Sequence, residues 1–195
     1  MTSGKLCHPG SWEDIKHGIE YVGKKYVRGK GTNGEKRTRY YAYGCSMGAT
    51  ILGLYLINDA ASADRELDGA VLYGTPWDYN KGFEYFMTGW GGWPSYALVK
   101  NLCRVTRAWQ LPQLKEHLSK EEYDHYEKGF TDCKGYDDLV NNVWLRMHDY
   151  QSLEHFLESL TLNGKLGQIG IPLFAFGSKD DLVLHHSTIP RDEIE

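Results

Sequence analysis

Short apolar runs alternate with a longer apolar run along the chain. Residues 39–43 and 67–74 have the composition of strands and are bounded by polar or turn residues. Between them, residues 49–57 are apolar almost throughout, which is typical of a buried helix. Residues 171–177 repeat the pattern of a buried parallel strand. The alternation of strand, helix and strand predicts an α/β fold with central parallel strands flanked by helices.

Helical spacing dominates most of the remaining sequence. Residues 12–26 place apolar side chains at helical intervals, and Ser11 stands at the N-cap position of this first helix. Residues 29–36 form a polar, glycine-containing loop. No strand pattern occurs between about residues 80 and 160. There we expect helices over residues 96–105, 112–118, 120–128, 136–143 and 152–160.

Composition narrows the function classes. The 195 residues are 41% hydrophobic and 25% charged, which suits one folded domain. A net charge of −4, with cations spread along the chain, gives no electrostatic case for binding nucleic acid. Four widely spaced cysteines without a Cys-x-x-Cys pair favour reduced thiols and an intracellular location. No apolar run reaches the roughly 20 residues of a membrane span, and no secretory signal pattern opens the chain.

The pentapeptide Gly44-Cys45-Ser46-Met47-Gly48 joins the first predicted strand to the buried helix. In a strand-turn-helix nucleophile elbow, flanking glycines permit a sharp backbone turn that projects a serine hydroxyl into an open site. This context predicts that Ser46 is a nucleophile. A serine also needs a histidine to remove its proton and an acid to orient that histidine.

The acid is expected at the end of another parallel strand. Asp180 and Asp181 follow the strand at residues 171–177, and Ser46 precedes Asp180 in the order serine, then acid, that alpha/beta hydrolases use. The base is harder to place. His185 and His186 follow Asp180 closely, so we expect solvated residues of the same loop there.

The sequence resembles the alpha/beta hydrolases of the fourth AB hydrolase family, the branch of medium-chain esterases, phospholipases and ethanol acyltransferases. The resemblance covers nearly the whole chain. It rests on His8-Pro9-Gly10-Ser11-Trp12-Glu13-Asp14-Ile15, Tyr43-Gly44-Cys45-Ser46-Met47-Gly48-Ala49, Gly74-Thr75-Pro76-Trp77-Asp78, Tyr136-Asp137-Asp138 with Asp149-Tyr150, and Gly177-Ser178-Lys179-Asp180-Asp181 with Ile189-Pro190.

The resemblance implies a partial alpha/beta hydrolase fold with a helical lid insertion at about residues 80–160. Ser46 would be the nucleophile, Asp180 the acid of the triad, with its neighbour Asp181 as the alternative, and the Met47 backbone N–H half of an oxyanion hole. The expected substrates are acyl or lipid esters, cleaved or transferred to alcohols without a cofactor or metal. Residues 89–94, with two tryptophans among glycines, suit either a lid over an acyl pocket or an aromatic-stapled loop.

The family also carries features that this sequence lacks. Its catalytic histidine follows one further strand, and several strands and an oxyanion loop precede the segment at Pro9-Gly10. We therefore expect an incomplete hydrolase domain that exposes apolar strand edges and aggregates or folds with a partner. In the full-length form it would be cytoplasmic or membrane-associated.

Two other functions remain to be weighed. The first is a truncated or remnant hydrolase without activity that binds only an acyl ligand or a partner chain. The second is a Rossmann-type nucleotide-binding domain, but Gly44-x-Ser46-x-Gly48 lacks the Gly-x-Gly-x-x-Gly spacing that lets a backbone approach a pyrophosphate.

Overall fold

The computed structural model describes residues 4–27 and 38–194, so the loop predicted at residues 29–36 lies outside the described part. The chain divides into two compact units. The helical unit comprises Met1–His8 and Asn80–Ser159, and the sheet unit comprises Pro9–Tyr79 and Leu160–Glu195. The region predicted as a helical insertion at about residues 80–160 corresponds closely to the first of these units.

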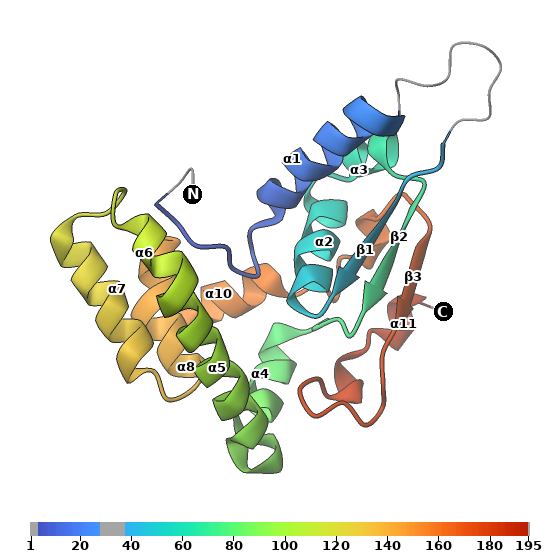
Figure 1. The fold of residues 1–195 in the computed structure, drawn as a ribbon. Coiled ribbons are helices and arrows are strands. Elements are labelled where there is room, and N and C mark those ends of the chain that lie inside the picture. Colours follow the sequence, from blue (N-terminus) through green and yellow to red (C-terminus); the bar gives the residue numbers. More distant parts are fainter. Residues whose placement is uncertain (1–3, 28–37, 195) are drawn as a thin grey trace. The chain divides into compact units, whose positions relative to one another are not determined.

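The sheet unit is built on three parallel strands in the order β1-β2-β3 (Figure 1). These are β1 (Tyr41–Cys45), β2 (Gly69–Tyr73) and β3 (Leu173–Phe176). The register pairs Tyr43 with Val71, and Val71 with Phe174. All three strands overlap predicted ones, although β1 runs two residues further than predicted, through Cys45. Their parallel pairing confirms the predicted α/β architecture.

The helix α2 (Met47–Asn58) covers one face of this sheet, because it packs against β1 and β2. Its residues 49–57 are all buried, as their apolar sequence predicts. Small residues on the covered face, such as Ala42 and Ala70, let the helix approach the strands closely. The other elements of the unit are α1 (Trp12–Val22), a π-helical turn (Gly23–Val27), α3 (Ala60–Glu66), two 3-10 turns (Leu166–Gln168 and His186–Thr188) and α11 (Arg191–Ile194).

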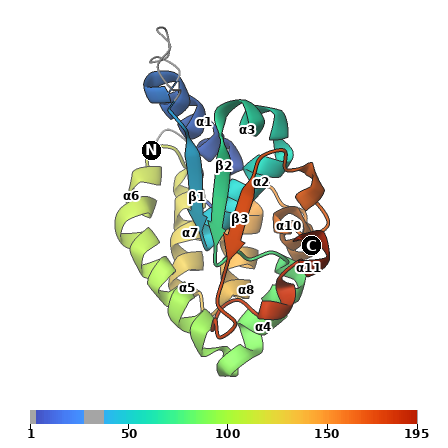
Figure 2. The ribbon, with the colours of Figure 1, turned by 90° about the vertical axis from the view of Figure 1, so that its right-hand side faces the viewer.

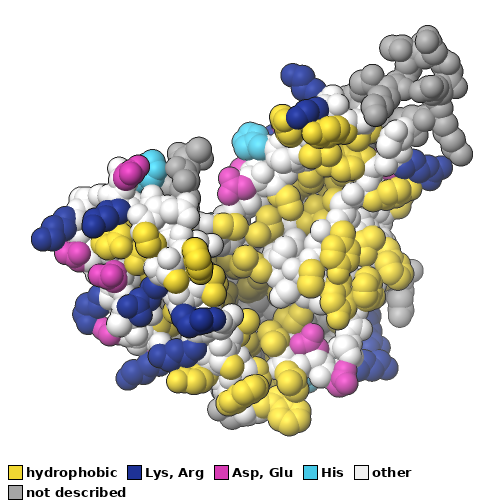
Figure 3. Space-filling model, in the orientation of Figure 1, with side chains coloured by type: hydrophobic (Ala, Val, Ile, Leu, Met, Phe, Trp, Pro, Cys, Tyr) yellow, Lys and Arg dark blue, Asp and Glu magenta, His cyan; other side chains and the backbone are white. Residues whose placement is uncertain are grey.

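The opposite face of the sheet is apolar and exposed. In Figure 2 the three strands face the viewer and α2 lies behind them. Tyr43 and Phe174 on this face are 61% and 64% exposed, and hydrophobic side chains cluster over the strands in Figure 3. Parallel sheets are normally covered on both faces. In the described residues β1 and β3 each have one unpaired edge, as expected from the sequence.

The exposed sheet face predicts self-association. Replacing Phe174 with Lys is expected to lower the apparent mass in light scattering at a given concentration, because it puts a charge on the apolar face without entering the core. The side chain of Leu72 lies on the opposite, covered face of the sheet and is fully buried. Leu72→Lys is therefore the contrasting variant and should unfold the sheet unit. An unchanged mass for Phe174→Lys would contradict a role of this face in association.

The helical unit contains the helices predicted between residues 80 and 160. No strand occurs among its described residues. Its elements are α4 (Tyr79–Thr88, which begins one residue before the unit), a 3-10 turn (Gly89–Gly92), α5 (Trp93–Val105), a π-helical turn (Thr106–Gln110), α6 (Leu111–Leu114), α7 (Lys120–Asp132), α8 (Tyr136–Leu139), a π-helical turn (Val140–Trp144), α9 (Leu145–Met147) and α10 (Leu153–Leu160, which ends one residue after it).

Some element boundaries differ from the predictions for local reasons. Ser11 precedes α1, but its side chain does not cap the helix. Ser119 does cap α7, because its hydroxyl accepts the Glu122 N–H while the Glu122 carboxylate accepts the Ser119 N–H. The helices α3 and α4 were not predicted. Within the described ranges, no helix combines the length and the apolar character needed to cross a bilayer.

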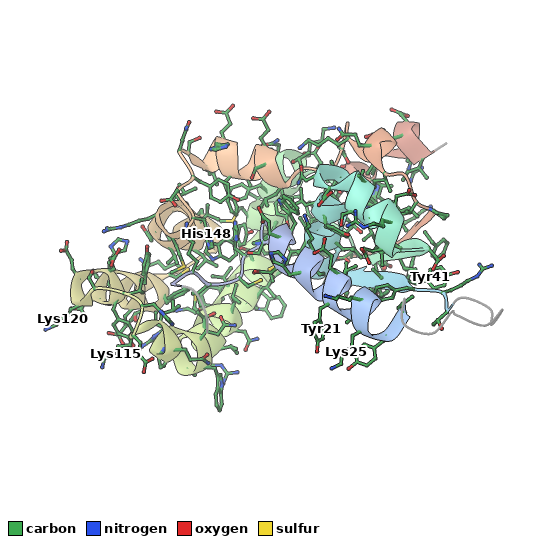
Figure 4. The ribbon with its side chains drawn as sticks, turned by 90° about the horizontal axis from the view of Figure 1, so that it is seen from above. Tyr21, Lys25, Tyr41, Lys115, Lys120 and His148 are labelled. Atoms are coloured by element: carbon green, nitrogen blue, oxygen red, sulfur yellow. The ribbon has the colours of Figure 1, made fainter. Side chains whose placement is uncertain are left out.

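A buried histidine, His8, and a half-buried one, His148, stack in the helical unit. The rings of His8 and His148 are 3.6 Å apart between centroids and nearly parallel (Figure 4 labels His148). His8 Nε2 lies 2.9 Å from the Tyr150 hydroxyl, whereas His148 Nε2 is buried without a partner among the described atoms. Burial and the neighbouring ring lower the pKa of His8 to about 3, and burial beside Lys5 lowers the pKa of His148 to about 4. Both rings are therefore neutral in the folded unit.

This pair predicts acid-sensitive stability. A histidine with a lowered folded pKa stabilises the fold fully above its unfolded pKa of about 6.5, and this stabilisation is lost as pH falls toward the folded value. Between pH 6.5 and 5 we expect a loss of about 2 kcal/mol per histidine. Thermal unfolding measured at pH 7.5 and pH 5 checks this. His148→Phe should reduce the pH dependence, whereas the exposed His17→Gln should leave it unchanged.

Candidate functional site

Ser46 lies in the turn between β1 and α2 with an unusual backbone conformation. Its φ is 52° and its ψ is −122°. Ser46 is one of three non-glycine residues with positive φ among the described residues. Such a conformation costs about 1–3 kcal/mol in a non-glycine residue and persists only where the surroundings impose it. Here the Ser46 N–H donates to the Tyr73 carbonyl at 2.9 Å, which extends the β1–β2 ladder by one residue. The Ser46 residue is exposed.

The two glycines of the pentapeptide have different roles. A Cβ on Gly44 would lie 2.6 Å from the Gly48 carbonyl oxygen and 2.8 Å from Ala49 Cα, so the first turn of α2 requires a glycine at this position. A Cβ on Gly48 would meet nothing within 4 Å. The expectation that glycine avoids a Cβ clash is therefore confirmed at Gly44 and wrong at Gly48.

The start of α2 provides free backbone donors beside Ser46. The Ala49 and Thr50 N–H groups donate to the Ser46 carbonyl, whereas those of Met47 and Gly48 have no acceptor among the described residues. Unpaired N–H groups in the first turn of a helix carry partial positive charge. This arrangement suits an anion or a developing oxyanion next to Ser46.

Asp180 lies on the loop that follows β3. The carboxyl ends of parallel strands meet at one edge of a sheet, so Ser46 and this loop share that edge, with β2 between their strands. Asp180 is exposed and accepts a hydrogen bond from the Ser178 hydroxyl, which lowers the pKa of its carboxyl. Asp180 is thus ionised at neutral pH.

Asp181, the alternative acid, holds the same loop together. One of its carboxylate oxygens accepts the N–H groups of Val183 at 2.8 Å and Leu184 at 3.0 Å. This is an Asx-type turn, and it commits that oxygen to the backbone of its own loop. The geometry therefore distinguishes a structural Asp181 from an exposed Asp180.

A pocket of about 180 Å³ opens at this edge of the sheet unit. The loop after β3 lines it with Asp181, His185 and His186, and an apolar wall is formed by Trp77, Phe176, Leu184, Ile189 and Ile194. The two histidine rings stack 4.5 Å apart, and His185 Nδ1 lies 2.6 Å from the Ser187 hydroxyl. Both lie on the loop, as expected; His186 is exposed, His185 is half-buried, and both line the pocket.

Thr75 adds a buried polar group to the pocket wall. This group was not among the predicted site residues. It is 4% exposed, and its hydroxyl has no hydrogen-bond partner among the described residues. A buried hydroxyl without a partner costs about 1–3 kcal/mol, so a ligand that supplied a partner would recover that energy. The segment is anchored behind the pocket, because the Trp77 carbonyl accepts the N–H groups of Leu162 and Asn163. In the sequence, Thr75 stood only as part of the segment Gly74-Thr75-Pro76-Trp77-Asp78 after a buried strand, without a role of its own.

The fold thus brings the predicted site residues to one edge of the sheet, but no hydrogen bond connects Ser46 with Asp180. Ser46 makes no side-chain hydrogen bond with any described histidine or carboxylate, and it does not line the pocket. No group of three or more His, Cys, Asp and Glu side chains in the described ranges is arranged to hold a metal ion. The four cysteines are free thiols.

Comparison with known proteins adds no family. No protein-family model matches the chain, and no curated protein or solved structure is significantly similar to it.

The glycine contacts give a matched pair of variants. Gly44→Ala is expected to disrupt the Ser46 turn and lower the melting temperature by several degrees, because backbone atoms of α2 must move. Gly48→Ala is expected to fold like the unchanged chain, since the position is open and alanine favours helix. Thermal unfolding followed by circular dichroism measures both. Equal melting temperatures for the two variants would contradict this account of the turn.

Proposed function

We propose that this chain carries the nucleophile and the acid of a serine hydrolase that acts on acyl esters, with Ser46 and Asp180 in these roles. The observation that carries the proposal is the strained, exposed Ser46 on a strand-turn-helix connection at φ 52° and ψ −122°. Strain of this kind clusters at functional sites. In α/β hydrolases, a strand-turn-helix connection of this type presents the nucleophile above the sheet.

In this reaction the Ser46 oxygen attacks the carbonyl carbon of the ester. The carbonyl oxygen becomes negatively charged, and the unpaired Met47 N–H is a suitable donor for it. Collapse of the intermediate breaks the ester C–O bond, and the leaving alkoxide takes up the proton that the Ser46 hydroxyl lost, so it departs as an alcohol. The acyl group stays on Ser46 until water or another alcohol removes it. The apolar pocket wall around Trp77 and Phe176 suits the hydrocarbon part of a small substrate.

A second candidate function is favoured by one observation. Ser46 has no histidine within hydrogen-bonding distance among the described residues, and proton removal by a base normally contributes about a hundredfold to ten-thousandfold in rate. A chain without a base near its serine would bind an acyl ligand at the pocket without turning it over. Proposals with and without turnover make different predictions for covalent labelling.

Labelling with a fluorophosphonate probe separates the two. The hydrolase proposal predicts covalent modification of Ser46, seen as an increased intact mass and located by peptide mass spectrometry, and no modification of Ser46→Ala. Ser46→Ala removes only an exposed hydroxyl and should fold normally. An unlabelled sample whose circular dichroism shows the folded chain would overturn the hydrolase and leave the binding function.

The same assay tests which carboxylate is the acid. Asp180→Asn should slow labelling by about a hundredfold without changing the melting temperature, because Asp180 is exposed. Asp181→Asn should mainly lower the melting temperature, because Asp181 holds the turn at Val183 and Leu184. The reverse outcome would move the role of the acid to Asp181.

A further inference from the structure

The helical unit contains a long segment without a negative side chain. Residues 85–115 include no Asp or Glu, although the whole chain has a net charge of −4. The same residues contain four cations and three of the six tryptophans. The segment includes α5 and the turns on either side of it, and its unusual composition is not explained by the Ser46 site.

The exposed side of α5 combines aromatic and basic side chains. Ser95, Val99 and Cys103 form the buried side of the helix. On another side of the helix, two aromatic residues and then three cations follow one another along the chain at intervals of three or four residues. This stripe, together with the next exposed tryptophan, is here called the α5 surface: Trp93, Tyr96, Lys100, Arg104, Arg107 and Trp109.

The aromatic side chains of this surface are strongly exposed. Trp93 is 67% exposed and Trp109 72%, and the preceding Trp90 is 72% exposed. Leu98 and Val105 are exposed too, but on a different side of the helix, because each lies only one or two residues from the nearest members of the stripe. Large apolar side chains that gather on one surface usually mark an interaction site. In Figure 3, Lys and Arg side chains lie among hydrophobic ones over the region of α5.

The cations of the α5 surface have no acidic partners. Lys100, Arg104 and Arg107 form no ion pair with any described carboxylate, whereas Lys128 on α7 pairs with Asp132. Lys100 lies 5.8 Å over the Tyr96 ring, and Arg104 donates to the Asn101 side chain at 3.1 Å. Their charge is therefore available to an anionic surface.

We propose that the α5 surface binds the surface of an anionic phospholipid bilayer. Tryptophan and tyrosine rings reside at the depth of lipid headgroups, and Lys and Arg beside them contact the headgroup phosphates and carboxylates. Each basic residue near such a membrane contributes about tenfold or less to binding at moderate salt. The proposal is independent of the hydrolase function, because it rests only on residues of the helical unit.

The chemistry favours lipid over other anionic partners. Single-stranded nucleic acid also stacks on aromatic rings, but it binds along positively charged grooves, whereas the α5 surface is the convex side of one helix. A bilayer accepts aromatic and basic groups from one helix face together. The exposed helix face with flanking tryptophans thus fits a membrane interface better than a phosphate backbone alone.

Co-sedimentation of the full chain with vesicles tests the proposal. Vesicles of phosphatidylcholine with 30% phosphatidylserine are expected to bind the chain at 0.1 M NaCl, and pure phosphatidylcholine vesicles to bind it at least about tenfold more weakly. Raising the salt to 0.5 M should weaken binding to the anionic vesicles. The triple variant Lys100→Gln, Arg104→Gln, Arg107→Gln should lower the partition coefficient about a hundredfold.

A matched control removes the same charge elsewhere in the helical unit. Lys120, at the start of α7 (Figure 4), is exposed together with Lys128 and Lys134, and their triple replacement by Gln should leave binding unchanged. Trp93→Ala with Trp109→Ala should reduce both binding and the quenching of tryptophan fluorescence by brominated lipid. Equal loss of binding in both charge variants, or no binding of the unchanged chain to anionic vesicles, would overturn the proposal. Binding to single-stranded RNA but not to these vesicles would also overturn it.

Discussion

The close approach of α2 to the end of β1 is the constraint on which the rest of the sheet unit depends. Because Gly44 has no side chain, the first turn of α2 comes very near the strand. A Cβ at this position would lie only 2.6 Å from the Gly48 carbonyl oxygen of the helix. This contact fixes the direction in which α2 leaves the sheet, and it forces the sharp turn onto Ser46. The hydrogen bond from Ser46 N–H to Tyr73 then ties the same turn to the neighbouring strand. The strain at Ser46 is thus imposed by the fit of a buried helix to a strand, and the core of the unit stabilises it.

Much of this arrangement follows from local sequence patterns. The run at residues 49–57 is apolar on every side, so only a fully buried helix satisfies it, and the structure buries each of these residues. The three strands were predicted because each is a short apolar run bounded by turn residues. The helix α3 was not predicted, because it mixes small and charged residues. Intrinsic preferences are weak in such a segment, and tertiary contacts decide its structure. The helix α4 was missed although Tyr79, Phe83 and Met87 follow helical spacing.

The site was less predictable than the fold. The position of Ser46 could be predicted because the turn chemistry is local to five residues. The distance between Ser46 and Asp180 depends on how two loops from separate strands are oriented. The sequence predicts only that both loops lie at the same edge of the sheet. The role of Asp181 in its Asx turn and the unpaired hydroxyl of Thr75 depend on atoms brought together by the fold. Hydrophobic periodicity says nothing about these polar contacts, so it could not separate Asp181 from Asp180.

The connection from β2 to β3 contains nearly the whole helical unit. Ala70 therefore pairs with Leu173, although more than half of the chain separates them, whereas β1 and β2 pair across a short helical connection. Pairing over such a separation has a large loop-closure entropy and is slow. During synthesis β1, α2 and β2 can assemble early, but β3 joins only after the intervening helices have been made. The pocket and the Asp180 loop depend on β3, so we expect them to form late in folding.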